Sequence, residues 1–198
     1  MNTPASTPQK LTDEKFVNLY AIARQTPKGN SKWVFASRKP TATAGTVSAD
    51  SVAIAVTVDT PSGRRLVITR EFRLPIGRHE LSLPAGLVDD GESIETAGAR
   101  ELHEETGLTL SKVLHVSPPV ASSAGMSDES VCLLYGEATG QASRDFQTEH
   151  EDIETRLLSI DDIRTLLRTP TSDVISSRLY PMLVGFVAAG SFAFPSLD

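Results

Sequence analysis

The stretch Gly86–Leu108, GLVDDGESIETAGARELHEETGL, decides how the rest of the chain is interpreted. Its second half places Glu101, Glu104 and Glu105 at positions i, i+3 and i+4. On an α-helix these offsets project from one face, so the carboxylates meet in a small volume. A bound divalent cation such as Mg²⁺, which prefers oxygen ligands, relieves the repulsion between them. A solvated acidic helix is the simpler alternative when the three glutamates are considered alone.

The helix that carries these glutamates is expected to span Ser93–Thr106. Ile94, Ala97 and Leu102 recur at helical spacing and are available for the buried side. Gly107 stands where a helix needs a left-handed residue after its last turn. The pattern therefore predicts a helix with one apolar side and one acidic side.

Apolar, β-branched runs outside this stretch predict strands separated by turns. Ser51–Val58 is continuously apolar, as expected for a strand buried on both faces. Helices are expected at Asp161–Leu167 and at Val174–Val187, where Pro181 should weaken or kink the second one. Further strands are expected at Arg65–Arg70, His79–Leu83, Val113–Val116, Ser130–Gly136 and Glu154–Ser159. Strands and helices mix without a regular alternation, which indicates an α+β fold or a mixed-sheet sandwich.

The chain before the long strand divides into two expected parts. Residues 1–10 are rich in Thr, Pro and Ser and are expected to form a disordered arm. Residues 11–46 are expected to form an N-terminal β-hairpin, with strands at Phe16–Ala23 and Lys32–Arg38 and a turn between them. Residues 47–198 then make up the main domain.

Composition limits the class of protein. A hydrophobic content of 39% and a charged content of 22% are typical of a soluble globular chain. The net charge of -6 does not favour a nucleic-acid partner, because such sites usually carry basic excess. The N-terminus lacks the apolar core of a signal peptide, and no apolar run reaches the ~18 residues that span a membrane. These features predict a cytoplasmic protein with no nucleic-acid or membrane partner.

Written as a motif, the opening stretch is Gly86-x5-Glu92-x7-Arg100-Glu101-Leu102-x-Glu104-Glu105-x-Gly107-Leu108. Every fixed position resembles the signature box of the Nudix hydrolases. The resemblance implies an α/β/α sandwich with a mixed β-sheet, in which the box forms a loop, a helix and a second loop. It also implies cleavage of a nucleoside diphosphate linked to another moiety, with Mg²⁺ or Mn²⁺ as cofactor.

Each charged residue of the box has an expected task. Glu101, Glu104 and Glu105 supply oxygen ligands for metal from one helical face, and Glu104 also counts among the catalytic residues. Arg100 is expected to orient these carboxylates through bidentate hydrogen bonds rather than touch substrate. Glu92, at the helix entry, assists at the metal or pairs with Arg100.

Three further residues are expected to have structural roles. Gly86 is expected to serve backbone geometry, as is the glycine that ends the helix. His103 points away from the glutamate face, which favours a surface histidine over a catalytic one. Cys132, the only cysteine, lies in an apolar run and is expected to be a buried thiol rather than a nucleophile.

The segments that lead into the box resemble the ADP-ribose pyrophosphatase branch and its relatives that hydrolyse nucleoside diphosphate sugars. Arg70–Gly77, REFRLPIG, is similar to the segment of that branch in which an arginine contacts the diphosphate, here Arg73. Leu83–Glu92, LPAGLVDDGE, also resembles that branch. The resemblance implies that the backbone carbonyl of Ala85 is a metal ligand.

The N-terminal region is expected to complete the substrate site. Trp33 falls where that branch carries a tryptophan that stacks on the base from across a homodimer; ordinary core packing is the alternative. Arg38 and Glu129 are further candidate substrate-binding residues. A homodimer is expected from the resemblance.

A general base is expected outside the helix, because the helix carboxylates are committed to metal. The segment His150–Glu154, HEDIE, resembles the loop and strand of that branch whose glutamate takes this role. Glu151 is the expected base, and Glu149 is the alternative.

Two departures concern the substrate. Ser82 stands where that branch usually has glutamate, and Ser123-Ala124-Gly125 replaces its Ser-Pro-Gly. The expected reaction is therefore Mg²⁺-dependent hydrolysis of ADP-ribose or a similar nucleoside diphosphate sugar to a nucleoside monophosphate and a sugar phosphate. A non-catalytic nucleotide-sugar sensor and a hydrolase of oxidised nucleoside triphosphates are the alternatives.

Overall fold

The computed structural model describes residues 7–42, 48–149 and 152–194. The chain divides into two compact units. The smaller unit comprises Met1–Asp50 and Pro119–Val131, and the larger comprises Ser51–Pro118 and Cys132–Asp198.

The smaller unit contains a three-stranded antiparallel sheet in the order β1-β2-β3. Its strands are β1 (Gln9–Lys10), β2 (Asn18–Thr26) and β3 (Gly29–Ser37). The predicted N-terminal hairpin is therefore confirmed. Residues 1–6 of the expected arm lie outside the described residues, and its last two residues, Gln9 and Lys10, form β1 and pair with β2. A short strand, β9 (Val120–Ala121), pairs with Ser130 and Val131, the first residues of β10 (Ser130–Thr139).

A buried tyrosine fixes the chain that leaves the hairpin. Tyr20 on β2 is 2% exposed and stacks on Phe35 of β3 with ring centroids 5.9 Å apart. Its hydroxyl lies 3.0 Å from the carbonyl oxygen of Lys39 and 2.7 Å from that of Pro40. Burying the ring while satisfying its hydroxyl holds the residues after β3 against the hairpin.

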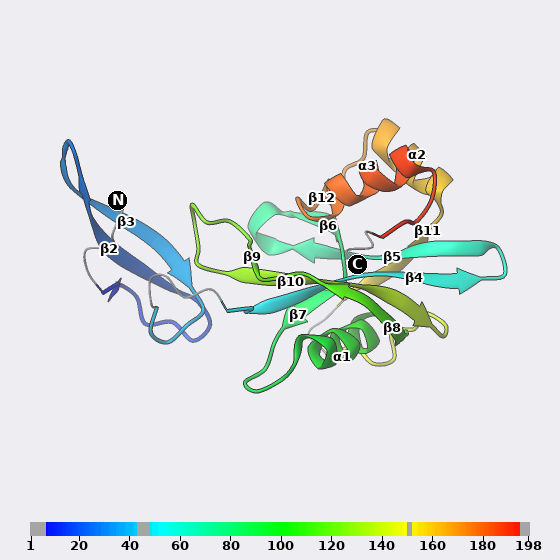
Figure 1. The fold of residues 1–198 in the computed structure, drawn as a ribbon, viewed down its shortest axis with the longest axis horizontal. Helices are drawn as coiled ribbons and strands as arrows, with labels where there is room; N and C mark the ends of the chain where they lie inside the picture. The colour runs from blue at the N-terminus through cyan, green and yellow to red at the C-terminus, as the bar shows by residue number, and fades with distance from the viewer. Residues whose placement is uncertain (1–6, 43–47, 150–151, 195–198) are drawn as a thin grey trace. The chain divides into compact units, whose positions relative to one another are not determined.

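The larger unit is a three-layer sandwich around a mixed sheet (Figure 1). Helix α1 (Ile94–Thr106) covers one face, and α2 (Ile160–Arg168) and α3 (Leu179–Ala189) cover the other. The strand order is β12-β6-β5-β4-β10-β8, with β11 on β5 and β7 on β4. Its strands are β4 (Ser51–Thr60), β5 (Gly63–Arg73), β6 (Arg78–Ser82), β7 (Ala85–Leu87), β8 (Thr109–Val116), β10 (Ser130–Thr139), β11 (Glu154–Leu158) and β12 (Val174–Ile175). The predicted mixed-sheet sandwich is confirmed.

The core beneath α1 forms on the central strand. Every residue from Val52 to Val56 on β4 is 0% exposed, as the continuous apolar run predicts. Ala97 and Leu102 of α1 pack onto this strand and onto Leu134 of β10. Burial of this apolar surface anchors α1 against the sheet.

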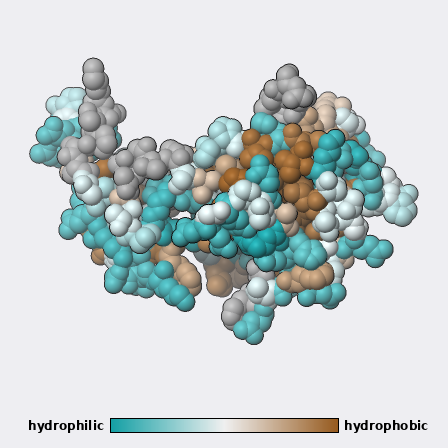
Figure 2. Space-filling model, turned by 60° about the horizontal axis from the view of Figure 1, so that its bottom comes forward, coloured by the Kyte–Doolittle hydropathy of each residue, from teal (hydrophilic) through white to brown (hydrophobic). Residues whose placement is uncertain are grey.

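Hydrophilic residues predominate on the face that Figure 2 shows. On the larger unit, hydrophobic side chains gather in one region among hydrophilic ones (Figure 2). Among the described residues, no helix has both the length and the apolar character that crossing a membrane requires.

The C-terminal segment differs from the sequence-based prediction. Val174 and Ile175 form β12, parallel to β6, and α3 begins only at Leu179. Pro181 therefore lies in the first turn of the helix, where backbone N–H groups have no partner within the helix, so it causes no kink. β7 was not predicted as a strand, and its pairing with β4 places the residues before α1 against the centre of the sheet.

An ion cluster ties the C-terminal segment to the sheet. Arg70 on β5 forms a bidentate pair with Asp173, with Nε–Oδ2 at 2.7 Å and Nη2–Oδ1 at 3.1 Å. Glu154 on β11 accepts hydrogen bonds from Arg156 at 2.9 and 3.2 Å and from Arg70 at 3.5 Å. The Arg70 guanidinium lowers the pKa of Asp173, and the Arg156 guanidinium is the main cause of the lowered pKa of Glu154. The cluster joins three segments that are distant in sequence.

Asp173→Asn should lower the free energy of unfolding at neutral pH and have little effect in strong acid. Because the folded-state pKa of Asp173 lies below its unfolded value of about 3.9, its contribution is present above that value. The contribution is lost as pH falls through the folded-state pKa. Urea unfolding from pH 7 to pH 2.5 should show the two curves converging, and a constant difference across that range would contradict the assignment. Asp145→Asn, an exposed aspartate of the same unit, is the control.

Candidate active site

Local sequence signals set the ends of α1. The Ser93 hydroxyl accepts a hydrogen bond from the Thr96 backbone N–H at 3.2 Å and caps the helix N-terminus. At the other end Gly107 adopts φ 74°, and its N–H donates to the His103 carbonyl. A Cβ at Gly107 would lie 2.8 Å from the backbone nitrogen of Ser143, so the position also requires glycine for close approach.

Arg100 gathers the carboxylates of the acidic side. Its Nε and Nη2 donate to Glu92 at 3.1 and 2.9 Å, and Nη1 donates to Glu101 at 2.7 Å. Nη2 also donates to the carbonyl oxygen of Leu87 at 3.0 Å, and Nη1 makes a longer contact with Glu104 at 3.4 Å. The Arg100 guanidinium, together with the Asp89 backbone N–H, lowers the pKa of Glu92. Arg100 therefore binds Glu92 through two donors and reaches Glu101 and Glu104 through Nη1 alone, and its role in catalysis stays a prediction.

The third glutamate is held from the other side. Glu105 is 8% exposed, and its Oε2 accepts a hydrogen bond from the backbone N–H of Ala85 at 3.2 Å. Ala85 lies on β7 opposite Ala53 of β4, so its position is fixed by the sheet. Glu105 and the proposed carbonyl ligand thus belong to one contact between α1 and β7.

Gly86 lies directly against the carboxyl group of Glu101. A Cβ at Gly86 would lie only 1.9 Å from Cδ of Glu101 and 2.0 Å from its Oε1. The Glu101 carboxyl group therefore occupies the space that any other residue at position 86 would fill. The motif glycine serves close packing against a carboxylate.

The donor chemistry of this face fits a hard divalent cation. Three carboxylates and a backbone carbonyl are oxygen donors of the kind that Mg²⁺ and Mn²⁺ take. Within the described part of the chain, however, no three side chains of His, Cys, Asp or Glu lie close enough together to hold a metal ion. Arg100 draws Glu101 and Glu104 toward itself, while Ala85 N–H holds Glu105. Cation binding therefore requires these side chains to turn toward a common point.

Gly86→Ala should weaken divalent cation binding about 10-fold or more while leaving the fold intact, because the new methyl group forces the Glu101 carboxylate out of its place. The end of a glutamate side chain moves easily, so the backbone need not shift. Titration with Mn²⁺, followed by calorimetry, measures the change. Gly185→Ala, where a Cβ meets open space, is the control. Equal affinity in wild type and Gly86→Ala would show that Glu101 is not a ligand.

Arg73 lies near the end of β5 and is already paired. Its Nη1 lies 2.7 Å from Glu71 and its Nε 3.1 Å from Glu80, which is opposite Glu71 on β6. The Arg73 side chain is 45% exposed, so it remains accessible to a ligand. An anionic substrate would have to compete with two carboxylates for this guanidinium.

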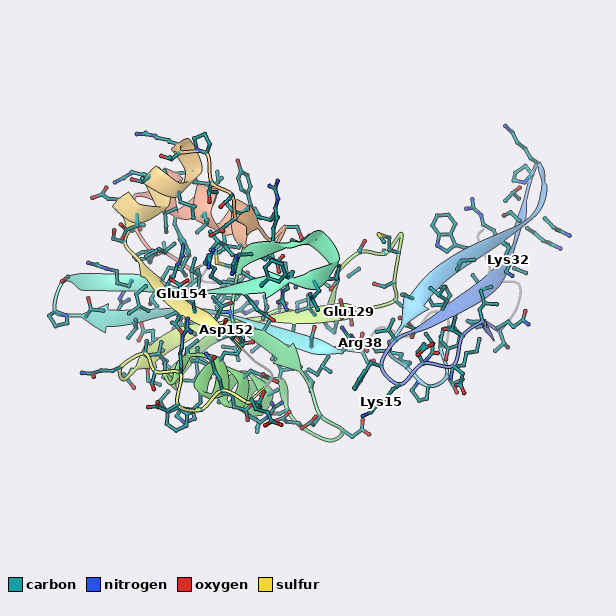
Figure 3. The ribbon with its side chains drawn as sticks, turned by 180° about the vertical axis from the view of Figure 1, so that it is seen from behind. Lys15, Lys32, Arg38, Glu129, Asp152 and Glu154 are labelled. Carbon is teal, nitrogen blue, oxygen red and sulfur yellow. The ribbon has the colours of Figure 1, made fainter. Side chains whose placement is uncertain are left out.

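In the smaller unit, Trp33 lies on β3 and is 44% exposed. Within the described part of the chain it is therefore not a buried core residue, which was the alternative to base stacking. Arg38 and Glu129, both candidate substrate-binding residues, bind each other, with Nε–Oε1 at 3.1 Å (Figure 3). Next to them, Ser37 donates to Asp128 at 3.0 Å, and the Nζ atom of Lys39 lies 3.8 Å from Asp128. This polar cluster links the end of the hairpin to the segment before β10.

The candidate base is not placed. Glu151 lies outside the described residues, and its alternative, Glu149, is exposed. His103 is partly exposed, and its ring centroid lies 4.1 Å from that of Phe146; its expected non-catalytic role stays a prediction. Cys132 is 2% exposed, as predicted, and burial raises the pKa of its thiol.

One residue near the acidic face was missed by the sequence analysis. Gln147 donates a hydrogen bond of 2.9 Å to the backbone carbonyl of Glu105. It lies in a polar loop whose composition predicts no partner. Nothing in the sequence signals a contact between residues 42 positions apart.

Comparison with known proteins gives a consistent picture. The family model described as "NUDIX domain" matches residues 49–179. The chain is 33% identical over 149 residues to "Putative nudix hydrolase 2" of Caenorhabditis elegans, covering 71% of this chain and 65% of that protein. It is 30% identical over 128 residues to "ADP-ribose pyrophosphatase" of Saccharomyces cerevisiae, covering 64% and 54%. It is 42% identical over 82 residues to "ADP-sugar pyrophosphatase" of Mus musculus, covering 41% and 37%.

The matched regions span about one third to two thirds of these relatives' own lengths. Among solved structures, one described as "Crystal structure of ADP compounds hydrolase" superimposes with a TM-score of 0.61. It is 17% identical in sequence, with 85% of this chain and 84% of that chain covered, and it supports the fold alone.

Proposed function

This chain belongs to the NUDIX family, and we propose that it hydrolyses the pyrophosphate bond of a nucleoside diphosphate sugar, such as ADP-ribose, to a nucleoside monophosphate and a sugar phosphate. The observation that carries the proposal is the acidic side of α1. There Arg100 draws Glu101 and Glu104 together, and Glu105 contacts the backbone of Ala85. Relatives named ADP-ribose pyrophosphatase and ADP-sugar pyrophosphatase support this class of substrate.

The acidic face holds the cofactor in this proposal. Glu101, Glu104 and Glu105 would bind Mg²⁺, or Mn²⁺, together with the carbonyl oxygen of Ala85. The cation supplies positive charge that neutralises the oxygens of the pyrophosphate. Arg100 would stay bound to Glu92 and to the Leu87 carbonyl through Nε and Nη2, next to the glutamates, while Glu101 and Glu104 turn toward the cation.

The remaining residues bind substrate and move a proton. Arg73 releases Glu71 and Glu80, binds the diphosphate and stabilises negative charge on its oxygens. Glu151, or Glu149 in its place, takes a proton from the water whose oxygen attacks phosphorus. The new phosphorus–oxygen bond forms as the bond to the bridging oxygen breaks. The electron pair of the broken bond stays on the bridging oxygen, so the leaving phosphate carries the negative charge.

The smaller unit selects the substrate in this proposal. Exposed Trp33 offers an aromatic face on which a nucleobase can stack. Arg38 and Glu129 provide one cation and one anion for hydrogen bonding to the rest of the nucleotide sugar. We propose that residues 11–46 pair with those of a second copy in a homodimer, with residues 47–198 as the hydrolase domain.

A substrate panel tests the proposal. ADP-ribose, GDP-mannose and an oxidised nucleoside triphosphate are incubated with the wild-type chain and Mg²⁺, and the nucleotide products are separated by chromatography. We expect a nucleoside monophosphate from at least one of the two nucleotide sugars, at a rate far above that from the triphosphate. Binding of ADP-ribose without turnover would instead assign a sensor function. Preferred cleavage of the triphosphate would assign a sanitising hydrolase.

A further inference from the structure

A cavity of about 310 Å³ lies between the sheet and α3 in the larger unit. Successive strand residues point to opposite faces of a sheet, and Leu134 of β10 packs in the core beneath α1. Its neighbours Leu133 and Tyr135 therefore face the other layer, where α3 lies, and both line the cavity (Figure 1). The cavity is thus on the opposite face of the sheet from the helix that carries the glutamates.

Aromatic rings form much of the cavity wall. Phe194 packs edge-to-face against Phe186 of α3 and against Tyr135 of β10, with ring centroids 5.6 and 5.5 Å apart, and all three rings line the cavity. Phe192 packs on Phe186 in the same way, with centroids 5.3 Å apart. These contacts hold the rings in place, so a planar aromatic ligand would meet several preformed ring surfaces with which to make the same kind of pair.

Two polar side chains accompany these rings. Arg178 is the one charged residue among the described residues that line the cavity, and it immediately precedes α3, at the positive end of the helix dipole. Tyr135 supplies a hydroxyl donor, and burial raises the pKa of this hydroxyl, so it stays protonated. Both groups donate hydrogen bonds, and a carboxylate accepts them, so the polar part of the wall matches an anion.

We propose that this cavity binds a small planar aromatic molecule that carries an anionic group, such as an aromatic carboxylate. The ring of the ligand packs on Phe186 and Phe194, and its anionic group accepts hydrogen bonds from Arg178 and Tyr135. The volume lies at the lower end of the range for small-molecule pockets, which suits a ligand of one or two rings. The site is separate from the proposed catalytic centre and does not depend on hydrolysis.

Two other ligand classes fit the wall less well. An acyl chain with a carboxylate would match the charge of Arg178, but it would not form the ring pairs that the aromatic wall offers. An aromatic cation would find ring faces that attract it, but Arg178 would oppose its charge. Each class can be represented by one probe in the test.

Calorimetric titration of the full chain with 2-naphthoate tests the proposal. The titration is made in EDTA, so that a carboxylate cannot bind through a metal ion at the acidic side of α1. Three further probes are titrated in the same way. 2-Naphthamide keeps the rings without the charge, decanoate keeps the charge without the rings, and 2-naphthylmethylammonium reverses the charge.

A filled cavity provides the sharpest variant. Gly185 lines the cavity, and a Cβ at this position meets no atom within 4 Å, so Gly185→Leu adds a side chain without displacing one. Leucine is also a better helix former than glycine, so α3 should stay folded. Ala188→Leu, at an exposed position of the same helix that does not line the cavity, is the matched control. Arg178→Gln removes the charge and keeps a polar side chain.

We expect the wild-type chain to bind 2-naphthoate at least about 10-fold more tightly than each of the other three probes, because it alone matches both rings and charge. Gly185→Leu should weaken that binding at least about 10-fold, whereas Ala188→Leu should leave it within about twofold of wild type. Arg178→Gln should reduce the preference for 2-naphthoate over 2-naphthamide to less than about threefold. Thermal unfolding of each variant, followed by circular dichroism, should show a folded chain at the temperature of the titration.

Four results would overturn the proposal. Absence of saturable 2-naphthoate binding up to the solubility limit of the probe would remove the site. Equal affinity in Gly185→Leu and wild type would show that the probe binds elsewhere on the chain. Equal affinity of the wild-type chain for 2-naphthoate and 2-naphthamide would remove the anionic group from the ligand class. Tighter binding of decanoate would assign the cavity to an acyl chain instead.

Discussion

Glu104→Gln and Glu105→Gln should each lower kcat for the preferred nucleotide sugar by about 100-fold or more, while the chain stays folded. Each change removes one negative charge and one good oxygen ligand from the acidic side of α1 without changing side-chain size. Glu105→Gln also keeps an oxygen that can accept from the Ala85 N–H, so the contact between α1 and β7 can survive. The loss should therefore lie in catalysis rather than in folding.

The measurement is steady-state turnover in saturating Mg²⁺, with thermal unfolding recorded on the same samples. Glu95→Gln is the matched control, because Glu95 is an exposed glutamate in the first turn of the same helix. Its turnover should match that of wild type. Rates near wild type in both Glu104→Gln and Glu105→Gln would remove the acidic face from the mechanism.

Arg100→Met should lower kcat/KM by about 10- to 100-fold, the range found when the partners that orient metal ligands are lost. The variant keeps an unbranched side chain but removes the hydrogen bonds to Glu92, Glu101 and Glu104. The carboxylates would then repel each other without a counter-charge, so the free energy of unfolding at pH 7 should fall as well. Saturating Mg²⁺ should recover part of that loss, since the cation replaces the guanidinium charge.

The pH dependence of this effect has a defined sign. Arg100 is the main cause of the lowered folded-state pKa of Glu92, so its contribution is present above the unfolded pKa of about 4.3. It disappears as pH falls through the folded-state value. Urea unfolding of wild type and Arg100→Met should therefore converge in acid. Arg168→Met, an exposed arginine at the end of α2, is the control, and equal stability at pH 7 would contradict the assigned role of Arg100.

Local signals explain why α1 could be predicted almost completely. Its apolar side and its terminal glycine are signals within the helix itself, and the structure reproduces both. The fully buried β4 was predictable because a continuous apolar run has few other solutions. β7 and β12, of three and two residues, exist only through pairing with distant strands, so no local pattern marks them.

The candidate site was predictable in chemistry and less so in geometry. The spacing of the glutamates placed them on one side of α1, but it could not show that Arg100 and Ala85 pull them in different directions. Trp33 illustrates a second limit, because burial is a property of the folded chain and its 44% exposure could not be read from its neighbours. Gln147 illustrates a third, since its hydrogen bond to the Glu105 carbonyl forms only in the tertiary fold.

The most direct measurement of whether this acidic side of α1 is a hydrolytic centre is product formation from nucleotide sugars with and without divalent cation. We expect the wild-type chain with Mg²⁺ to release a nucleoside monophosphate and a sugar phosphate in equal amounts, AMP and ribose 5-phosphate in the case of ADP-ribose. Addition of EDTA should stop the reaction, and excess Mg²⁺ should restore it. Equal rates in EDTA and Mg²⁺, or no monophosphate from any nucleotide sugar of the panel, would contradict the proposed centre.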